Sequence, residues 1–362
     1  MELICNHQKL LAAIRNTERL VGRNISLPIL GTILLNAQRG HLQISATNLE
    51  VGIKIKVPAK IEAEGSLAVP ARVISEFIGA INDEKIKLKA DKNSLHITSE
   101  NYKTQILGLK PDDFPIIPTI RDGQETKLEP AVLKRALSAV VDSAATSETR
   151  PELSGVYCAV GPQSIEVAAT DSFRLSEYRG GVISSSAGAT FILPRFSSAE
   201  IIRLLDFESQ PISLVTSDNQ CVVRGQDLEF VSRLIDGHYP DYKRVIPEKA
   251  QATAVVSRPE FERAIRIASV FTSAISDIKI KASGDKLALL SRNSERGETN
   301  AHLPAKIGGQ FELAVNYRYL LDGLKILEGD KIVLGFCGAG APLLVKAEGN
   351  DYQTYVIMPL RN

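Results

Sequence analysis

Cysteines are few and far apart in this sequence. Only four of the 362 residues are cysteine, and Cys5, Cys158, Cys221 and Cys337 form no CxxC pair or other close spacing. This is typical of free thiols in a reducing compartment, and it argues against a disulfide framework or a zinc site. No run approaches the roughly 18 apolar residues that suggest a membrane span. The amino-terminal MELICNHQKL also lacks the features of a secretory signal, so we expect a cytoplasmic protein without a membrane role.

The short motifs that mark common catalytic and cofactor sites are missing as well. The five histidines are scattered and form no HExxH pair, so nothing indicates a metal site. There is no GxxxxGKS/T phosphate loop, no GxGxxG turn and no GxSxG elbow. The adjacent carboxylates Asp112 and Asp113 follow Pro111 and indicate a turn. We therefore predict no cofactor and no catalysis, and a binding platform rather than an enzyme.

One pattern does occur, and it occurs three times. A strand followed by a turn appears in LQISATNLE (42–50), IEVAATDSF (165–173) and LALLSRNSE (287–295). A strand that enters a helix and a proline-containing closing segment recur at nearly the same interval, about one third of the chain. Such a period predicts three similar domains. The aligned residues are Thr47, Thr170 and Arg292; Pro70, Pro194 and Asn316; and Pro115, Pro240 and Pro359.

Each repeat opens with a helical pattern and contains a second, shorter one. In the first repeat Leu10, Ile14, Thr17 and Val21 form one apolar stripe. The opening helices are expected in 7–22, 129–145 and 258–271, and the shorter ones near 70–82, 194–206 and 316–327.

The rest of each repeat is mostly strand, as in VGIKIKV (51–57), where apolar residues alternate with lysines. We therefore predict an α+β fold with three similar domains, each with two helices packed on antiparallel sheet. The predicted domains are 1–123, 124–248 and 249–362.

Charge is slightly segregated toward the expected helices. The whole chain has 43 Lys and Arg against 42 Asp and Glu, a net charge of +1, whereas the six helical segments sum to +4 and the remainder to −3. Solvated helix faces would explain this distribution. A sparse basic lining would equally attract duplex DNA without reading its bases.

The stretch VAATDSFRLSEY (167–178) leaves three interpretations open. It places Thr170 and Asp171 at the end of an apolar strand, with Arg174 soon after. The pair can end a strand by bonding local backbone. It can instead belong to a catalytic site around Asp171 and Arg174, or to a surface that holds another protein.

Over its full length the sequence resembles the bacterial DNA polymerase III β subunit family, the sliding clamps. The segments that carry the resemblance are SLPIL (26–30), TNLEVGI (47–53), VPARVISEFI (69–78), DDFP (112–115), ATDSFRL (169–175), LIDGHYPDYKRVIP (234–247) and YVIMPLRN (355–362). The resemblance implies the DNA clamp fold, in which two three-domain chains join head to tail into a closed ring. Helices would line the hole and strands would form a continuous outer layer, and ring closure would pair sheet edges that are otherwise a liability.

The resemblance also implies where this homodimer joins and where duplex DNA lies. The joint would lie between the first domain of one chain and the third of the other, near Thr104, Ile106 and Ile267. Arg23 is offset by one residue from a DNA-contacting arginine of relatives, and Arg150 precedes a proline that replaces an aromatic residue. The candidate DNA-facing residues are Arg15, Arg19, Arg23, Lys134, Arg150, Arg195, Arg203, Arg263 and Arg266.

A pocket for short partner peptides is implied in the same way. Apolar residues with a few polar anchors suit an extended peptide, although ordinary core would also explain Val356 and Met358. This chain has Ser172-Phe173 where relatives often have Gly-His, and Pro342 where a serine is common. The implied residues are Leu153, Thr170, Ser172, Phe173, Arg174, Leu175, Pro240, Arg244, Val245, Val356, Met358, Pro359, Leu360 and Arg361, with Asn316, Tyr319 and Pro342 at the margin.

The function that the resemblance implies is that of a processivity factor. The ring would encircle DNA without sequence specificity and tether the α subunit of DNA polymerase III and other replication and repair proteins. A separate ATP-dependent clamp loader is implied, because the chain has no phosphate loop. Two alternatives stay open: a hydrolase or transferase built by triplication, and a monomeric repeat scaffold with no DNA role.

Overall fold

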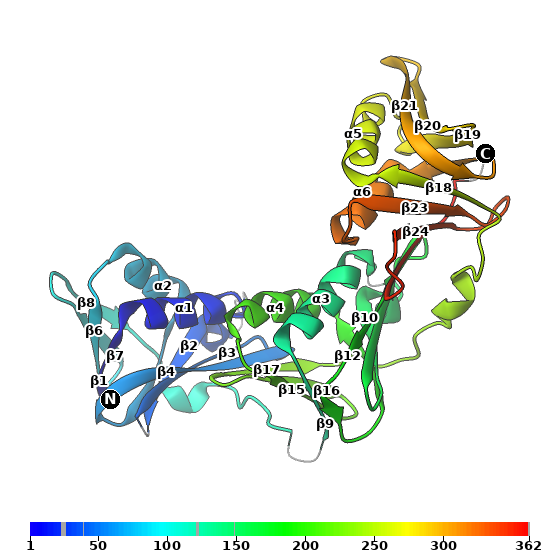
Figure 1. Ribbon diagram of the computed structural model, residues 1–362. Helices are drawn as coiled ribbons and strands as arrows, with labels where there is room; N and C mark the ends of the chain where they lie inside the picture. Colours follow the sequence, from blue (N-terminus) through cyan, green and yellow to red (C-terminus); the bar gives the residue numbers. More distant parts are fainter. Residues whose placement is uncertain (23–26, 39, 121–122, 148, 361–362) are drawn as a thin grey trace. The chain divides into compact units, whose positions relative to one another are not determined.

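The computed structural model describes residues 1–22, 27–38, 40–120, 123–147 and 149–360. The chain forms two compact units (Figure 1). Unit 1 comprises 1–130, 183–187 and 203–234, and unit 2 comprises 131–182, 188–202 and 235–362. None of the helices in the described residues is long and apolar enough to cross a membrane.

Unit 1 is built on one sheet, in the order β13-β9-β15-β16-β17-β4-β1-β6-β7-β8, with β5, β2 and β3 continuing beside β4. Helices α1 and α2 pack against each other and against its strands. Its elements are β1 (Glu2–Asn6), α1 (His7–Glu18), η1 (Pro28–Gly31), β2 (Thr32–Gln38), β3 (His41–Thr47), β4 (Val51–Ala63), β5 (Gly65–Pro70), α2 (Ala71–Ala80), β6 (Lys85–Asp91), β7 (Ser94–Thr98), β8 (Lys103–Leu107), η2 (Pro111–Asp113), β9 (Gln124–Leu128), β13 (Ser184–Ser185), η5 (Leu205–Phe207), β15 (Ile212–Thr216), β16 (Gln220–Arg224) and β17 (Leu228–Arg233).

Unit 2 has a second antiparallel sheet, in the order β14-β10-β11-β12-β25-β24-β23-β18-β21-β20-β19-β22. Helices α5 and α6 pack together over a core that includes Phe261, Leu320 and Tyr355. The elements that lie wholly or mostly in this unit are α3 (Pro130–Val140), η3 (Val141–Ser143), η4 (Pro151–Ser154), β10 (Gly155–Val160), β11 (Ser164–Thr170), β12 (Arg174–Gly181), β14 (Ala189–Pro194), α4 (Arg195–Leu204), η6 (Tyr242–Val245), β18 (Ala252–Ser257), α5 (Arg258–Ser269), β19 (Asp277–Ser283), β20 (Lys286–Asn293), β21 (Gly297–Gly308), β22 (Phe311–Asn316), α6 (Tyr317–Ile326), β23 (Lys331–Phe336), β24 (Leu343–Ala347) and β25 (Gln353–Ile357).

The opening helix shows how local sequence sets these elements. The side chain of Asn6 caps α1 by accepting a hydrogen bond from the backbone N–H of Lys9 at 3.1 Å. Leu10 and Ile14 are buried, as the apolar stripe predicts. The helix ends at Glu18, earlier than predicted, so Val21 lies beyond it and its place in the stripe was wrong.

The three-repeat α+β fold is confirmed. The shorter helices α2, α4 and α6 begin at Ala71, Arg195 and Tyr317, one period apart. The sheets, however, run across the repeats, because β17 of the second repeat pairs with β4 of the first, and β25 of the third pairs with β12 of the second. The boundaries at 123 and 248 stay a prediction.

Candidate functional site

The turn after β11 is built from local hydrogen bonds. The Thr170 hydroxyl donates to the Arg174 carbonyl at 2.6 Å and accepts the N–H of Ser172 at 3.1 Å. One carboxylate oxygen of Asp171 accepts the N–H groups of Phe173 and Arg174, both at 3.0 Å. Ser172 has a φ of 76°, in the left-handed region that favours glycine. The interpretation of Thr170 and Asp171 as a strand-ending turn is therefore confirmed.

The first repeat has the same turn after β3. The Thr47 hydroxyl donates to the Val51 carbonyl at 2.7 Å, and Leu49 has a φ of 79°. In both repeats a strand of the following repeat then bonds the turn: Arg233 N–H donates to the Glu50 carbonyl at 2.9 Å, and Met358 N–H donates to the Phe173 carbonyl at 2.8 Å. The stretch VAATDSFRLSEY (167–178) therefore contains one copy of a junction that also occurs in the first repeat.

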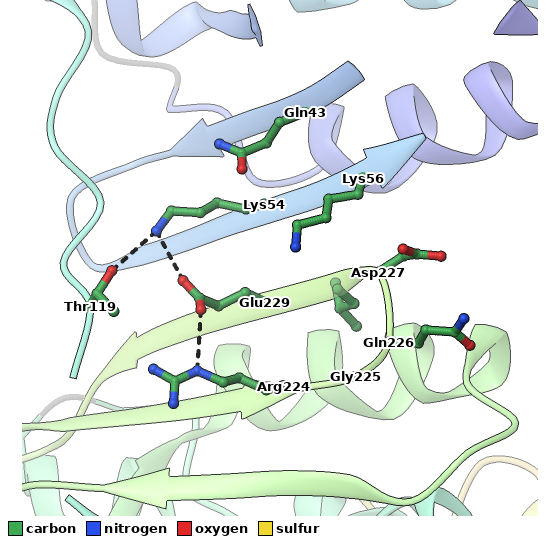
Figure 2. Close-up of a pocket in the computed structure, with 10 residues that line it drawn as sticks. Gln43, Lys54, Lys56, Thr119, Arg224, Gly225, Gln226, Asp227 and Glu229 are labelled. Atoms are coloured by element: carbon green, nitrogen blue, oxygen red, sulfur yellow. Dashed lines mark hydrogen bonds and ion pairs between the residues drawn. The ribbon is translucent and has the colours of Figure 1, made fainter. Parts of the chain in front are cut away.

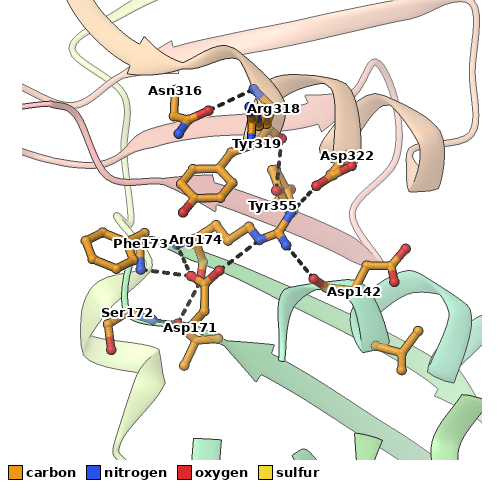
Figure 3. Close-up of polar contacts among 12 residues, drawn as sticks. Asp142, Asp171, Ser172, Phe173, Arg174, Asn316, Arg318, Tyr319, Asp322 and Tyr355 are labelled. Carbon is orange, nitrogen blue, oxygen red and sulfur yellow. Dashed lines mark hydrogen bonds and ion pairs between the residues drawn. The ribbon is translucent and has the colours of Figure 1, made fainter. Parts of the chain in front are cut away.

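Arg174 links three elements of unit 2 from this turn (Figure 3). Its guanidinium bonds the Asp171 carboxylate at 3.1 Å, the Asp322 carboxylate at 2.5 Å and the Asp142 carbonyl at 2.6 Å. It also lies over the Tyr319 ring, with Cζ 4.8 Å from the ring centroid. Because only 12% of its side chain is exposed, Arg174 holds β12, α6 and η3 together rather than serving as a free cation.

Asp322 is the partner of Arg174 on α6, and it also accepts a hydrogen bond from Lys325 at 2.7 Å. Burial alone would raise the pKa of Asp322, but hydrogen bonds from Lys325 and Arg174 outweigh it and hold that pKa below its ordinary value. A carboxyl group with a lowered pKa contributes stability above its unfolded pKa and loses it as the pH falls through the folded pKa.

We therefore expect Asp322→Asn to destabilise the protein by about 1–2 kcal/mol at pH 7. The difference from wild type should begin to shrink near pH 4, where the carboxyl group of the unfolded chain becomes protonated, and should be lost as the pH falls through the lower pKa of the folded state. Urea unfolding at pH 7, 4 and 3 measures this, with Asp351→Asn, at an exposed position of the same unit, as the control. A difference that is independent of pH would show that Asp322 is not the titrating group.

An apolar cluster lies beneath the turn. Leu175 and Val356 face each other on β12 and β25, are 2% and 1% exposed, and share a cluster with Tyr242. The Tyr239 hydroxyl oxygen accepts the N–H of Thr170 at 3.1 Å. Burial raises the pKa of Tyr242, and so do the neighbouring carboxylates. These side chains form the floor of the candidate site, and Val356 is indeed core.

Exposed apolar side chains lie at the edge of this floor. Phe173 is 60% exposed and Val245, in η6, is 41% exposed. Met358, Pro359 and Leu360 follow β25 and line a cleft of about 380 Å³ together with residues 336 and 338–341. Exposed apolar groups beside a cleft are typical of a site for another molecule.

The remaining predicted pocket residues lie on several elements of unit 2. Asn316 caps α6 by accepting the N–H of Arg318 at 2.9 Å, and Arg244 pairs with Asp241 at 2.7 Å. Leu153 is buried in η4, Pro240 precedes η6, Pro342 precedes β24, and Arg361 lies outside the described residues.

Sequence reasoning missed Asp142, Asp322, Tyr239, Tyr242 and Tyr355. The two tyrosines of GHYPDY lay within the most specific family segment, which was the available signal for them.

The candidate DNA-facing cations divide into two groups. Arg15 on α1, Arg19 directly after it, and Arg263 and Arg266 on α5 are exposed, with Arg266 bonded to Glu262 at 2.7 Å. The others with described positions contact the protein or are half-buried, and Arg23 lies outside the described residues. Arg150 bonds Glu152, Arg195 bonds the Val141 carbonyl, and Arg203 bonds Asn16. Lys134 is half-buried.

Strand β8 has one open edge among the described residues. Two backbone hydrogen bonds lie at the ends of the β7–β8 pair: Ser99 N–H donates to the Tyr102 carbonyl, and Gly108 N–H donates to the Asn93 carbonyl. They fix which residues of β8 bond to β7, because bonded and non-bonded residues alternate along an antiparallel pair. Thr104 and Ile106 therefore bond inward to β7, whereas Gln105 and its alternate neighbours direct their N–H and C=O groups outward. Of the predicted joint residues, the Ile106 side chain is buried and that of Ile267 is exposed.

Three family models match consecutive parts of the chain. They describe the DNA polymerase III beta subunit: its N-terminal domain at 1–118, its central domain at 127–241 and its C-terminal domain at 243–361. No group of three or more His, Cys, Asp or Glu side chains within the described ranges could hold a metal ion.

Known proteins agree with these matches over the whole length. The beta sliding clamp of Staphylococcus aureus (strain Mu50 / ATCC 700699) is 27% identical over 374 residues, covering 100% of this chain and 99% of the relative. The DNA polymerase III beta subunit of Thermotoga maritima is 26% identical with a TM-score of 0.94, covering 100% of this chain and 99% of that one. A sliding clamp of Bartonella birtlesii, solved bound to griselimycin, is 27% identical with a TM-score of 0.94 over 100% of both chains.

The three-domain α+β fold is thus that of a DNA polymerase sliding clamp. The chain belongs to the DNA polymerase III beta subunit family. It is accordingly a processivity factor of DNA replication and not an enzyme, as predicted. The alternative of a hydrolase or transferase around Asp171 and Arg174 was wrong, and those two side chains bond each other at 3.1 Å.

Proposed function

We propose that two copies of this chain close head to tail into a ring that encircles duplex DNA and tethers the replicative polymerase. The observation that carries the ring is the series of strand pairings. The last strand of the second repeat, β17, pairs with the fourth strand of the first, and β25 of the third repeat pairs with β12 of the second. The last strand of the first repeat, β8, is left with an open edge among the described strands.

If the series continues, β8 pairs with the fourth strand of a third repeat. That strand is β21 of another copy, and its amino-terminal half corresponds to the part of β4 that pairs with β17. Within the described residues β20 pairs with 297–304 of β21 and β18 with 305–308, so the amino-terminal half of β21 has one open side. Each copy thus offers one edge on β8 and one on β21, and two copies satisfy both and close the assembly. Exposed apolar side chains support this joint, with Leu107 on β8 72% exposed, and Ile267, Val270 and Ile275 exposed on and after α5. Pairing at this joint would remove apolar surface from water.

DNA contact is proposed for the exposed arginines on and directly after α1 and on α5. Arg15, Arg19, Arg263 and Arg266 carry fixed positive charge that attracts phosphates regardless of sequence. Contacts that are few and non-specific leave the ring able to slide.

The tethering site is proposed at the β12–β25 junction of unit 2. Its exposed Phe173 and Val245 would receive apolar side chains of an extended peptide from the DNA polymerase III α subunit, the clamp loader or other replication and repair proteins. The ring would act in the cytoplasm, at the nucleoid, and an ATP-dependent loader would open it.

Topological linkage is tested by retention on DNA. We expect protein loaded onto nicked circular DNA to stay bound through gel filtration at about 0.5 M salt, where phosphate contacts alone are too weak to hold it. Linearising that DNA with a restriction enzyme should release the protein within minutes, because a ring slides off a free end. Equal retention on circular and linear DNA, or equal loss from both, would contradict encirclement.

A further inference from the structure

Unit 1 has a polar pocket of about 300 Å³ whose lining includes none of the residues assigned above (Figure 2). It lies over neighbouring strands β3, β4, β17 and β16, beside the chain segment at Thr119. Its charged side chains come from two repeats: Lys54 and Lys56 lie on β4, Arg224 on β16, Glu229 on β17, and Asp227 directly before β17.

Glu229 holds two of these cations in place. It accepts Lys54 Nζ at 2.9 Å on one oxygen and Arg224 Nε at 3.2 Å on the other. Lys54 also lies 3.4 Å from the Thr119 hydroxyl, and Arg224 donates to the Ile120 carbonyl at 3.0 Å. Burial would raise the pKa of Glu229, but the hydrogen bonds and charges of Lys54 and Arg224 outweigh it and keep that pKa below its ordinary value.

Lys56 adds a third cation that this arrangement does not neutralise. Within the described residues its ammonium has no hydrogen bond or ion pair, and it is exposed. Figure 2 shows it on the same side of β4 as Lys54, whereas the carboxylate of Asp227 lies away from Lys54 and Glu229, beyond Lys56. The lining therefore has three cations and two carboxylates, and of the two carboxylates Glu229 is the one that bonds Lys54 and Arg224.

The spacing of these cations sets the size of the anion that fits. Lys54 and Lys56 are two residues apart on one strand, so they share a face and their Cα atoms are about 7 Å apart. A single carboxylate or phosphate would contact one end of this row. Two linked phosphoryl groups would reach both lysines and the guanidinium, each through charge-assisted hydrogen bonds.

We propose that this pocket binds a diphosphate group, free or as part of a nucleotide. Lys56 and Lys54 bond its oxygens from β4 and Arg224 bonds them from β16, while Thr119 and Gln43 provide neutral donors at the sides. Glu229 orients Lys54 and Arg224 and at the same time competes with the ligand for them. Its lining shares no residue with the proposed ring joint or with the proposed peptide pocket.

The two roles of Glu229 separate this proposal from a purely structural ion-pair network. If the cluster only joins β4 to β17, Glu229→Gln weakens the fold and does not increase the affinity for diphosphate. If the pocket binds diphosphate, the same change also removes a negative charge from the ligand's position, so affinity rises.

Isothermal titration of the full-length protein with sodium pyrophosphate, in a chloride buffer of low ionic strength, tests the site. We expect saturable binding of one pyrophosphate per chain. Lys56→Met should weaken it about tenfold, the loss of one charge-assisted contact. Lys60→Met, an exposed lysine further along the same strand, should leave it unchanged, and Glu229→Gln should tighten it severalfold.

Further ligands define the chemistry and the outcomes that would overturn it. ADP that binds as tightly as pyrophosphate supports a diphosphate site that also accepts nucleotides, and weaker ADP binding supports free pyrophosphate as the ligand. Orthophosphate that binds as tightly as pyrophosphate would overturn the diphosphate assignment. So would the absence of saturable binding, or equal losses in Lys56→Met and Lys60→Met. Circular dichroism of each variant separates lost binding from lost folding.

Discussion

Replacing Gln105 with proline is expected to convert the dimer into monomers. The N–H of Gln105 points away from β7, so proline removes a donor only from the open edge of β8. The proline ring also occupies the space that a partner strand needs. Each ring has two such joints, so the substitution acts twice, and we expect dimer dissociation to become easier by about 100-fold or more.

Sedimentation velocity across a concentration series measures this shift. Gln105→Val is the matched control, because it keeps the N–H and favours strand, and it should remain dimeric. Circular dichroism should show both variants folded, since the β7–β8 bonds involve the other set of residues. A proline variant that stays dimeric at the wild-type concentration would contradict pairing through β8.

The repeated junctions also define the register of this joint. Arg233 and Met358 each donate their N–H to the carbonyl two residues after the asparagine or aspartate of a turn. In the second repeat Arg233 pairs with Gln220, the first residue of β16. In the first repeat Leu107 pairs with Ser94, the first residue of β7, so Leu107 is the residue of β8 equivalent to Arg233. The matching turn of the third repeat follows Asn293, whose side chain accepts the N–H groups of the second and third residues beyond it. We therefore expect the Leu107 N–H to reach that turn in the partner subunit.

Local sequence was sufficient for the parts of the fold that depend on local physics. The helical pattern in 129–145 and the alternation in VGIKIKV marked α3 and β4 correctly. The early end of α1 was missed because Val21 continues the apolar spacing beyond Glu18, where the helix ends. Pairing of β4 with β17 joins Lys54 to Glu229, 175 residues away, and no local pattern encodes that choice of partner.

The candidate site divides in the same way. The turn at Thr170 and Asp171 was predictable because the hydrogen bonds that its two side chains make with the backbone lie within four residues. The ion pair of Arg174 with Asp322 spans 148 residues, and helical spacing indicates only that Asp322 lies on one face of α6. The family resemblance identified Arg174 as a pocket residue, whereas the structure shows that its guanidinium is already bound on three sides.

Truncating the exposed apolar pair Phe173 and Val245 to alanine is expected to abolish tethering without affecting the fold. Both side chains are largely exposed, so their removal leaves no cavity and should change stability by no more than about 0.5 kcal/mol. A peptide that covers them loses its apolar contacts, and we expect its affinity to fall by about 30- to 1000-fold. Leu175→Ala is a poorer test, because a buried leucine truncated to alanine costs about 2–5 kcal/mol of stability.

Binding of the purified DNA polymerase III α subunit, followed by surface plasmon resonance, measures this loss. Phe196→Ala is the matched control, since Phe196 is an exposed phenylalanine on α4 that belongs to no predicted pocket position. It should bind the α subunit as wild type does. The double variant should remain dimeric and stay on nicked circular DNA, because the ring joint and the arginines of α1 and α5 are untouched. Wild-type affinity in the double variant would place the tethering site elsewhere, whereas lost DNA retention would show that the truncations had damaged the ring itself.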